Sequence, residues 1–129
     1  MSLLFDASAI INLSHRNTPM VFMVGKTVSL AEYEIGNAIC KRVKLTGELL
    51  EEEGAQMFTK IVESVTLMDT ITLPQVGDAL HMACEEGLSY YDAYYITAAK
   101  VSGSVLVTDD KTLLLKARRH IDAISSADL

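Results

Sequence analysis

Acidic residues at four places in the sequence have the chemistry and the surroundings of a metal site. Each follows an apolar strand-like segment or lies beside an apolar helical face, and the residues are Asp6, Glu34, Asp92 and the pair Asp109 and Asp110. Hard divalent cations such as Mg²⁺ and Mn²⁺ bind oxygen ligands in octahedral geometry, and carboxylates from separate elements supply such ligands. The pattern therefore predicts a carboxylate site for Mg²⁺ or Mn²⁺.

Each of these acids, taken alone, also has a purely structural interpretation. Asp92 has the position of a helix N-cap, because it comes just before an apolar helical segment. Glu34 has the character of a solvated residue on a surface helix. Asp109 and Asp110 follow a strand, where Asp commonly caps the next helix. The hypothesis of a shared site rests on the combination of acids and not on any one of them.

Two of the acids lie together only if two apolar strands are neighbours. The run Leu3–Phe5 predicts a buried strand that ends at Asp6 and leads into a helix over 7–13. Val105–Val107 predicts a second apolar strand, which ends shortly before Asp110. Parallel α/β sheets bind ligands at the carboxyl ends of strands, where the connection order reverses. If these two strands are adjacent, Asp6 and Asp110 meet at that edge.

Strands and helices alternate along the rest of the chain. Further strands are expected over 27–28, 68–73 and 121–124, and further helices over 20–24, 29–43, 48–65, 76–86, 93–101 and 113–116. Ser29 and Glu32 form a predicted capping box at the start of one helix, on which Glu34, Asn37 and Lys41 share a face. The alternation predicts a three-layer α/β/α sandwich with a central parallel sheet of four to five strands, in a single domain over residues 1–129.

Four short segments, taken in order, resemble the successive motifs of PIN domains. They are Phe5-Asp6-Ala7-Ser8-Ala9, Glu34-Ile35-Gly36-Asn37-Ala38, Tyr91-Asp92-Ala93 and Leu106-Val107-Thr108-Asp109-Asp110-Lys111-Thr112-Leu113. The resemblance runs nearly end to end. It implies a PIN-like fold and a Mg²⁺- or Mn²⁺-dependent endoribonuclease, and small single-domain members of the family are commonly VapC-type toxins of toxin–antitoxin pairs. It also implies RNA as substrate, an antitoxin protein as partner, and a homodimer.

The same resemblance implies roles for individual residues. The catalytic, metal-binding carboxylates would be Asp6, Glu34, Asp92 and Asp110, and the residues that support them would be Ser8, Asn37, Thr108 and Asp109. Asp110 is favoured over Asp109 as a ligand because the family motif is Thr, any residue, Asp. With one metal, an acid such as Asp92 or Glu34 would position or deprotonate the attacking water, whereas two metals would themselves flank the phosphate. The sequence leaves both schemes open.

The overall charge restricts how such a protein can meet RNA. The 129 residues include 17 acidic and 11 basic side chains, for a formal net charge of −6. A protein that neutralises many phosphates carries a basic surplus, so a broad nucleic-acid coat is excluded. Contacts to RNA must be local, and the candidates are Lys41, Arg42 and Arg16. The alternative for Lys41 and Arg42 is a solvated cationic helix end.

Several other features bear on partners and location. Cys40 and Cys84 are expected to be reduced packing residues rather than a disulfide. Tyr91 and Tyr95, one helical turn apart, are expected in the core or at a dimer face, with base stacking as the alternative. The apolar segments 20–24 and 57–65 are the candidate dimer interfaces. No apolar run reaches the ~20 residues of a membrane span, and no secretory signal is evident, so the cytoplasm is the expected location.

Two other functions compete with that of a nuclease. A receiver-like signalling domain needs an acidic pair after the first strand and a Lys after the last, whereas here Asp6 stands alone and no Lys follows 121–124. A catalytically weak PIN-fold module that binds RNA or protein is the closer alternative, and the complete set of acids argues against it. Saturable binding of Mg²⁺ or Mn²⁺ that is lost in Asp6→Asn is expected only if the acids form a site.

Overall fold

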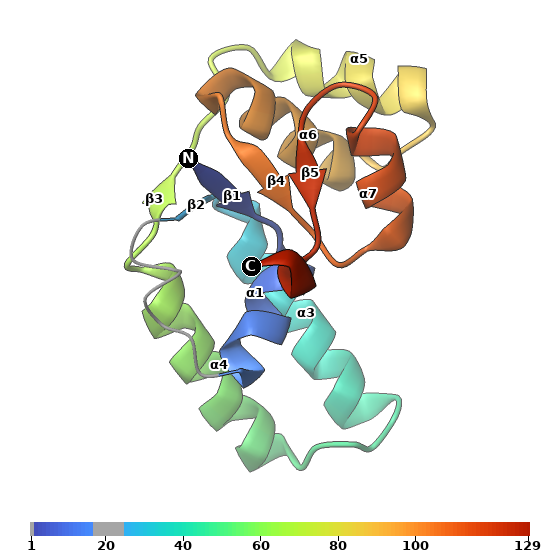
Figure 1. Cartoon of the computed structure of the whole chain (residues 1–129). Coiled ribbons are helices and arrows are strands. Elements are labelled where there is room, and N and C mark those ends of the chain that lie inside the picture. Colours follow the sequence, from blue (N-terminus) through green and yellow to red (C-terminus); the bar gives the residue numbers. More distant parts are fainter. Residues whose placement is uncertain (1, 17–24) are drawn as a thin grey trace.

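A five-stranded parallel sheet forms the centre of the protein (Figure 1). The computed structural model describes residues 2–16 and 25–129, so the helix predicted over 20–24 lies outside the described residues. The strands are β1 (Leu3–Phe5), β2 (Lys26–Thr27), β3 (Asp69–Thr70), β4 (Val105–Val107) and β5 (Ala123–Ile124). Their order is β3-β2-β1-β4-β5, and each neighbouring pair is parallel. The strands β1 and β4 are therefore neighbours, as the predicted site requires.

Six α-helices and one 3-10 turn accompany the sheet within the described residues. They are α1 (Ala7–His15), α3 (Leu30–Lys44), α4 (Glu51–Val65), α5 (Val76–Glu86), α6 (Tyr90–Ser102), α7 (Lys111–Ala117) and the 3-10 turn η1 (Ser126–Asp128). In Figure 1, α5, α6 and α7 gather at one end of the molecule, and α1, α3 and α4 gather at the other. The predicted α/β/α architecture is confirmed. Among the helices described, none has the length and apolar character needed to cross a bilayer.

Four of the described helices start one to three residues away from the predicted position, and α3 and α4 also show how their first turns are closed. Ser29 does not form the predicted capping box, because its own backbone is helical (φ −59°, ψ −29°) and its side chain makes no capping hydrogen bond. The first turn of α3 is closed instead by the backbone, where the Ala31 N–H donates to the Val28 carbonyl at 3.0 Å. Helix α4 begins three residues later than predicted, and the Glu53 carboxylate accepts the Leu50 N–H at 2.9 Å across its first turn.

The strand predicted over 68–73 is shortened to the two residues of β3. Strand β3 is at the edge of the sheet, so it has a hydrogen-bonding neighbour on one side, and both of its residues are exposed. Met68 and Leu73, at either end of the predicted segment, are buried outside the strand, with 6% and 5% of their surfaces exposed. The alternating pattern therefore overestimated the length of the ladder.

Helix α6 packs against both central strands, β1 and β4. It carries the fully buried Ala93, Ala98 and Ala99, whose small side chains let its backbone lie close to the neighbouring elements. On the sheet, Leu4 and Leu106 are also fully buried. Since α6 carries one of the predicted site acids in its first turn, this packing holds that acid in a fixed relation to the strand ends.

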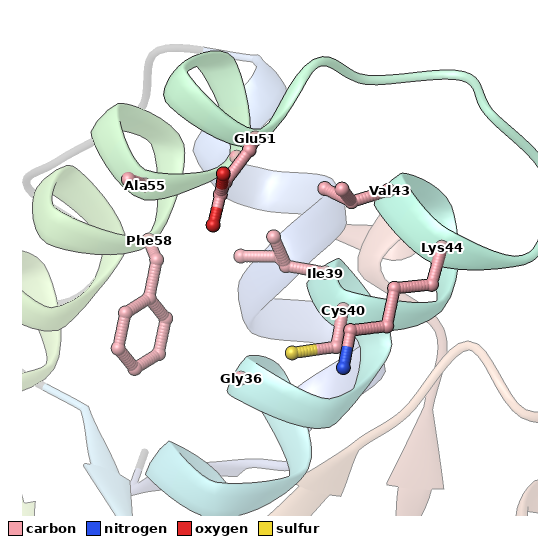
Figure 2. Close-up of a pocket in the computed structure, with 9 residues that line it drawn as sticks. Gly36, Ile39, Cys40, Val43, Lys44, Glu51, Ala55 and Phe58 are labelled. Atoms are coloured by element: carbon pink, nitrogen blue, oxygen red, sulfur yellow. The ribbon is translucent and has the colours of Figure 1, made fainter.

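Helices α3 and α4 pack against each other with an apolar hollow of about 290 Å³ between them. Figure 2 shows Ile39 and Cys40 projecting from α3, and Phe58 from α4, into this space. Gly54 of α4 lies close against α3, because an added Cβ there would lie 2.9 Å from Val43 Cγ2. Cys40 and Cys84 are free thiols, as predicted, but both are exposed, so the packing role predicted for them is wrong.

Candidate active site

Four carboxylates from four different elements line one hollow of about 320 Å³. They belong to Asp6 after β1, Glu34 on α3, Asp92 in the first turn of α6 and Asp110 before α7. The strand register explains how the first and last of them meet, because Phe5 pairs with Val107 and the Asp6 N–H donates to the Val107 carbonyl at 3.1 Å. The predicted meeting of Asp6 and Asp110 at the carboxyl ends of neighbouring strands is confirmed.

Asp6 is buried, with 4% of its surface exposed. Its Oδ1 accepts hydrogen bonds from the Ser8 hydroxyl at 2.7 Å and from the Ala9 N–H at 2.9 Å, and its Oδ2 accepts one from the Thr108 hydroxyl. Burial raises the pKa of Asp6 to about 6 and the charge of Glu34 adds to this, while the three hydrogen bonds act in the opposite direction. Ser8 and Thr108 thus lie beside Asp6, as predicted, and orient its carboxylate.

The carboxylates around the hollow repel one another in a chain. Burial raises the pKa of Glu34, the nearby Tyr95 hydroxyl acts in the opposite direction, and the charge of Asp92 raises the pKa further. Burial likewise raises the pKa of Asp92, and the charge of Asp110 adds to the shift. Like charges gathered in a partly desolvated hollow disfavour the ionised forms of Glu34 and Asp92. A cation bound among them would relieve both the repulsion and part of the cost of burial.

The capping interpretations of Asp92 and Asp110 have different outcomes. Ser89 is the N-cap of α6, since its hydroxyl accepts the Asp92 N–H at 3.1 Å, so the N-cap interpretation of Asp92 is wrong. Asp110 does cap α7, because its Oδ1 accepts the Leu113 N–H at 3.1 Å. A cap and a place in the hollow are compatible for Asp110, because one bonded oxygen fixes the carboxylate while the side chain still lines the hollow.

Asp109 points away from the hollow and joins the β4–α7 loop to two other segments. Its carboxylate accepts hydrogen bonds from Asn12 Nδ2 at 2.7 Å, from the Ser126 N–H at 2.8 Å and from the Ser126 hydroxyl at 2.6 Å. Although burial acts the other way, these bonds leave its pKa below the ordinary value. The expectation of Asp109 as a helix cap is wrong. Its role is to tie η1 and α1 to the loop that carries Asp110.

Only one of the three predicted basic residues lines the hollow. Lys41 does so, together with Asn37, on the same face of α3 as Glu34, as their spacing predicted. Arg42, one residue further along the helix, faces another way and pairs with Glu48 at 3.2 Å. Arg16 donates instead to the Ser126 carbonyl at 3.2 Å. Neither Arg42 nor Arg16 lines the hollow, because the direction of each side chain depends on its own packing.

Tyr95 is a part of this site that the sequence did not reveal. Its ring is in the core, as one of its predicted alternatives required, with 1% of the surface exposed, but the residue also lines the hollow beside Asp6 and Glu34. Tyr91, by contrast, is 56% exposed, so it is not a core residue, and a dimer face or base stacking stays a prediction for it. The signal available in the sequence was that Tyr95 follows Asp92 by three residues, which places both on one helical face.

The donor set of the hollow fits a hard divalent cation. Glu34 Oε1 is buried and has no hydrogen-bond partner among the described residues, and a cation would compensate such an acceptor. Within residues 2–16 and 25–129, His, Cys, Asp and Glu side chains form no group of three already arranged around an ion. Mg²⁺ is suited to such an open site, because it keeps several waters and binds one or two carboxylates together with substrate phosphates.

The sheet order and the carboxylates at the ends of β1 and β4 define the PIN-like class of α/β domains. The crystal structure of PAE2754 from Pyrobaculum aerophilum has the same fold, with a TM-score of 0.84 and 30% sequence identity. The match covers 99% of this chain and 94% of that one. The similarity therefore extends over the whole arrangement of elements that surrounds the hollow.

Two curated relatives, also from Pyrobaculum aerophilum, identify the family. Exonuclease VapC9 is 37% identical over 93 residues, which are 72% of this chain and 67% of the relative. Ribonuclease VapC3 is 31% identical over 125 residues, which are 90% of this chain and 95% of the relative. No family model matches the sequence. On these relatives, the chain belongs to the VapC family of PIN-domain proteins, and the receiver-like alternative is wrong.

Proposed function

We propose that this protein is a Mg²⁺- or Mn²⁺-dependent endoribonuclease whose active site is the hollow lined by Asp6, Glu34, Asp92 and Asp110. The observation that carries the proposal is the convergence of these four carboxylates, from segments spread along the chain, on one hollow. Membership of the VapC family supports a nuclease, since one relative is named an exonuclease and the other a ribonuclease. The endonucleolytic mode and the metal dependence are proposals of our own.

Each residue of the hollow has a distinct task in this proposal. Asp6, Glu34, Asp92 and Asp110 hold the cation, and Ser8 and Thr108 keep the Asp6 carboxylate in place through their hydrogen bonds. When bound, the cation supplies a water of lowered pKa and neutralises charge that develops on the phosphate. Lys41, on the rim, contacts a phosphate of the RNA, and Asn37 beside it supports the carboxylates.

The charge of the hollow makes RNA binding depend on the cation. Four carboxylates and a single lysine give the hollow an excess of negative charge, which repels a phosphodiester. With one Mg²⁺ bound, the formal net charge of the protein rises from −6 to −4, and the local change is the one that the substrate meets. RNA affinity should therefore rise steeply when the divalent ion is added.

Cleavage of a circular RNA tests this function, because a circle has no ends and is opened only by an endonuclease. Wild-type protein with Mg²⁺ or Mn²⁺ is expected to linearise the circle, and EDTA is expected to stop the reaction. Asp92→Asn should lower the rate by more than the about 10–100-fold that is typical of residues supporting a metal ligand. The matched control is Asp78→Asn, which changes the third residue of α5 as Asp92 is the third residue of α6. This control should retain full activity.

The outcomes separate the competing functions. Loss of activity in both Asp92→Asn and Asp78→Asn would show no special role for Asp92, and this result would contradict the proposed active site. Degradation of linear RNA with circular RNA intact would replace the endonuclease by an exonuclease. Saturable, Asp92-dependent metal and RNA binding without any cleavage would identify the catalytically weak binding module instead.

We also propose the partners that family membership suggests, namely an antitoxin protein and a second copy of this chain. We propose further that residues 1–129 form a single domain. The predicted dimer segment 57–65 lies on α4, where Ile61 is buried and Met57 and Phe58 are half-buried, and the segment 20–24 lies outside the described residues. Light scattering of the purified protein tests the dimer, and co-purification with the product of a neighbouring gene tests the antitoxin. The cytoplasmic location stays a prediction.

A further inference from the structure

The hydroxyl of Tyr95 lies at the metal hollow in a setting that packing alone does not explain. The ring of Tyr95 fills the core, and a phenylalanine ring would fill the same space. The hydroxyl is buried and makes no hydrogen bond of good geometry within the described part of the chain. A buried polar group without a partner is destabilising, so its presence in a native core calls for a reason.

A second unpaired polar atom lies in the same hollow. Glu34 Oε1 is also buried and without a hydrogen-bond partner among the described residues. Glu34 and Tyr95 both line this hollow, and a tyrosine hydroxyl can donate a hydrogen bond to a carboxylate oxygen. One protonated donor and one unpaired acceptor face the same space, on α6 and α3 respectively.

We propose that Tyr95 is a positioning residue that donates its hydroxyl proton to Glu34 Oε1 when the cation is bound, so that the other carboxylate oxygen is held toward the ion. This inference rests on the proposed function of the hollow. The hydroxyl acts through Glu34 and touches neither the ion nor the RNA. Outer groups that orient a ligand in this way typically change metal affinity or activity by about 10–100-fold when removed.

The fold supports this pairing by placing Tyr95 and a metal-site acid on one rigid helix. Asp92 and Tyr95 are separated by three residues on α6, which places them on one face of the helix, and both line the hollow. The neighbouring Tyr94 is half-buried and packs edge-on against the Tyr90 ring, with ring centres 5.9 Å apart. Tyr94 does not line the hollow, so it offers a matched control on the same helix.

The test compares Tyr95→Phe with Tyr94→Phe in the full chain. Three quantities are measured: the urea midpoint of unfolding in EDTA, the dissociation constant for Mn²⁺ by calorimetry, and kcat and KM for RNA cleavage. Tyr95→Phe should raise the Mn²⁺ dissociation constant by about 10-fold or more. Its metal-free midpoint should be no lower than that of wild type, because an unpaired buried hydroxyl has been removed. Tyr94→Phe should leave Mn²⁺ affinity within about twofold.

A double-mutant cycle shows whether Tyr95 acts through Glu34. In the Glu34→Ala background, adding Tyr95→Phe should change the Mn²⁺ dissociation constant by less than about twofold, because the acceptor of the pair has been removed. An unchanged Mn²⁺ affinity in Tyr95→Phe, or a full additional loss in the Glu34→Ala background, would overturn the proposal. So would a lowered metal-free midpoint with a proportionate loss of affinity, since this would assign the hydroxyl a purely structural role.

The same measurements distinguish failure of this inference from failure of the proposed function. Wild-type protein that neither binds Mn²⁺ nor cleaves RNA would refute the metal nuclease itself. Wild-type protein that does both, with Tyr95→Phe indistinguishable from it, would refute only the role of Tyr95.

Discussion

Neutralising Asp6 should stabilise the metal-free protein at high pH while destroying its ability to bind the cation. The buried carboxyl has its pKa raised from an ordinary value of 3.8 to about 6, chiefly by burial. A folded-state pKa above the unfolded value means that the native protein binds the proton more tightly. The stabilisation this supplies is fully present below about pH 3.8 and is lost as the pH rises through about 6.

The size of this effect follows from the two pKa values. A rise from 3.8 to about 6 corresponds to about 3 kcal/mol between the protonated and ionised forms. About 1.4 kcal/mol of this is expected between pH 5 and pH 8, where the unfolded carboxyl is already ionised. Asp6→Asn removes the titration but keeps an amide oxygen that can accept the Ala9 N–H and the Ser8 hydroxyl.

Urea unfolding in EDTA at pH 5 and pH 8 measures this difference. The free energy of unfolding of wild type should fall by about 1.4 kcal/mol more than that of Asp6→Asn over this interval. Comparing the two proteins cancels the titration of groups they share, and the exposed Asp78→Asn should behave like wild type. Saturating Mg²⁺ should then stabilise wild type and leave Asp6→Asn unchanged. Equal pH dependence in wild type and Asp6→Asn would refute the argument that burial raises the pKa of Asp6.

Five further substitutions test the packing, the choice of ligand and the RNA contact. Gly54→Ala should lower the free energy of unfolding by about 1–3 kcal/mol, because the added methyl group meets α3. Gly77→Ala has open space around the added methyl group and should raise the free energy of unfolding by up to about 1 kcal/mol. Equal changes for the two variants in urea unfolding would contradict this packing argument. Asp109→Ala should destabilise the fold by about 1–3 kcal/mol and retain Mn²⁺ affinity. Asp110→Asn should lose Mn²⁺ affinity and retain stability, since Asn still caps α7. Calorimetry measures the Mn²⁺ affinity of both variants, and urea unfolding measures their stability. Lys41→Met should raise KM for RNA and reduce the slope of log affinity against log salt by about 0.7, and an unchanged slope would remove Lys41 from the interface.

Much of the fold could be read from local patterns, because the forces that define each element act over a few residues. Apolar runs at Leu3–Phe5 and Val105–Val107 predicted the two central strands, and both are found with those bounds. Gly87 and Gly103 end their helices in the left-handed conformation, with φ of 66° and 63°. Prediction failed at Ser29, where a capping pattern is present but a local backbone hydrogen bond from the Ala31 N–H to the Val28 carbonyl closes the first turn instead.

The candidate site was also predictable in part from local sequence patterns. The sequence by itself determined which acids are available, that Asp6 and Asp110 follow strands, and that Glu34, Asn37 and Lys41 share a helical face, because strand ends and helical spacing are local geometry. The tertiary structure decided what those residues meet.

Two neighbouring aspartates and a tyrosine illustrate why this second part could not be read in advance. Asp109 and Asp110 are adjacent in one loop, yet one bonds to Asn12 and Ser126 and the other lines the hollow. Tyr95 has the pattern of a core residue, and it lines the hollow together with Glu34 only because α6 packs against β1 and β4. Side-chain direction and charge repulsion depend on neighbours that are distant in the chain, so only the folded protein decides which carboxylates share a cation and which residue orients them.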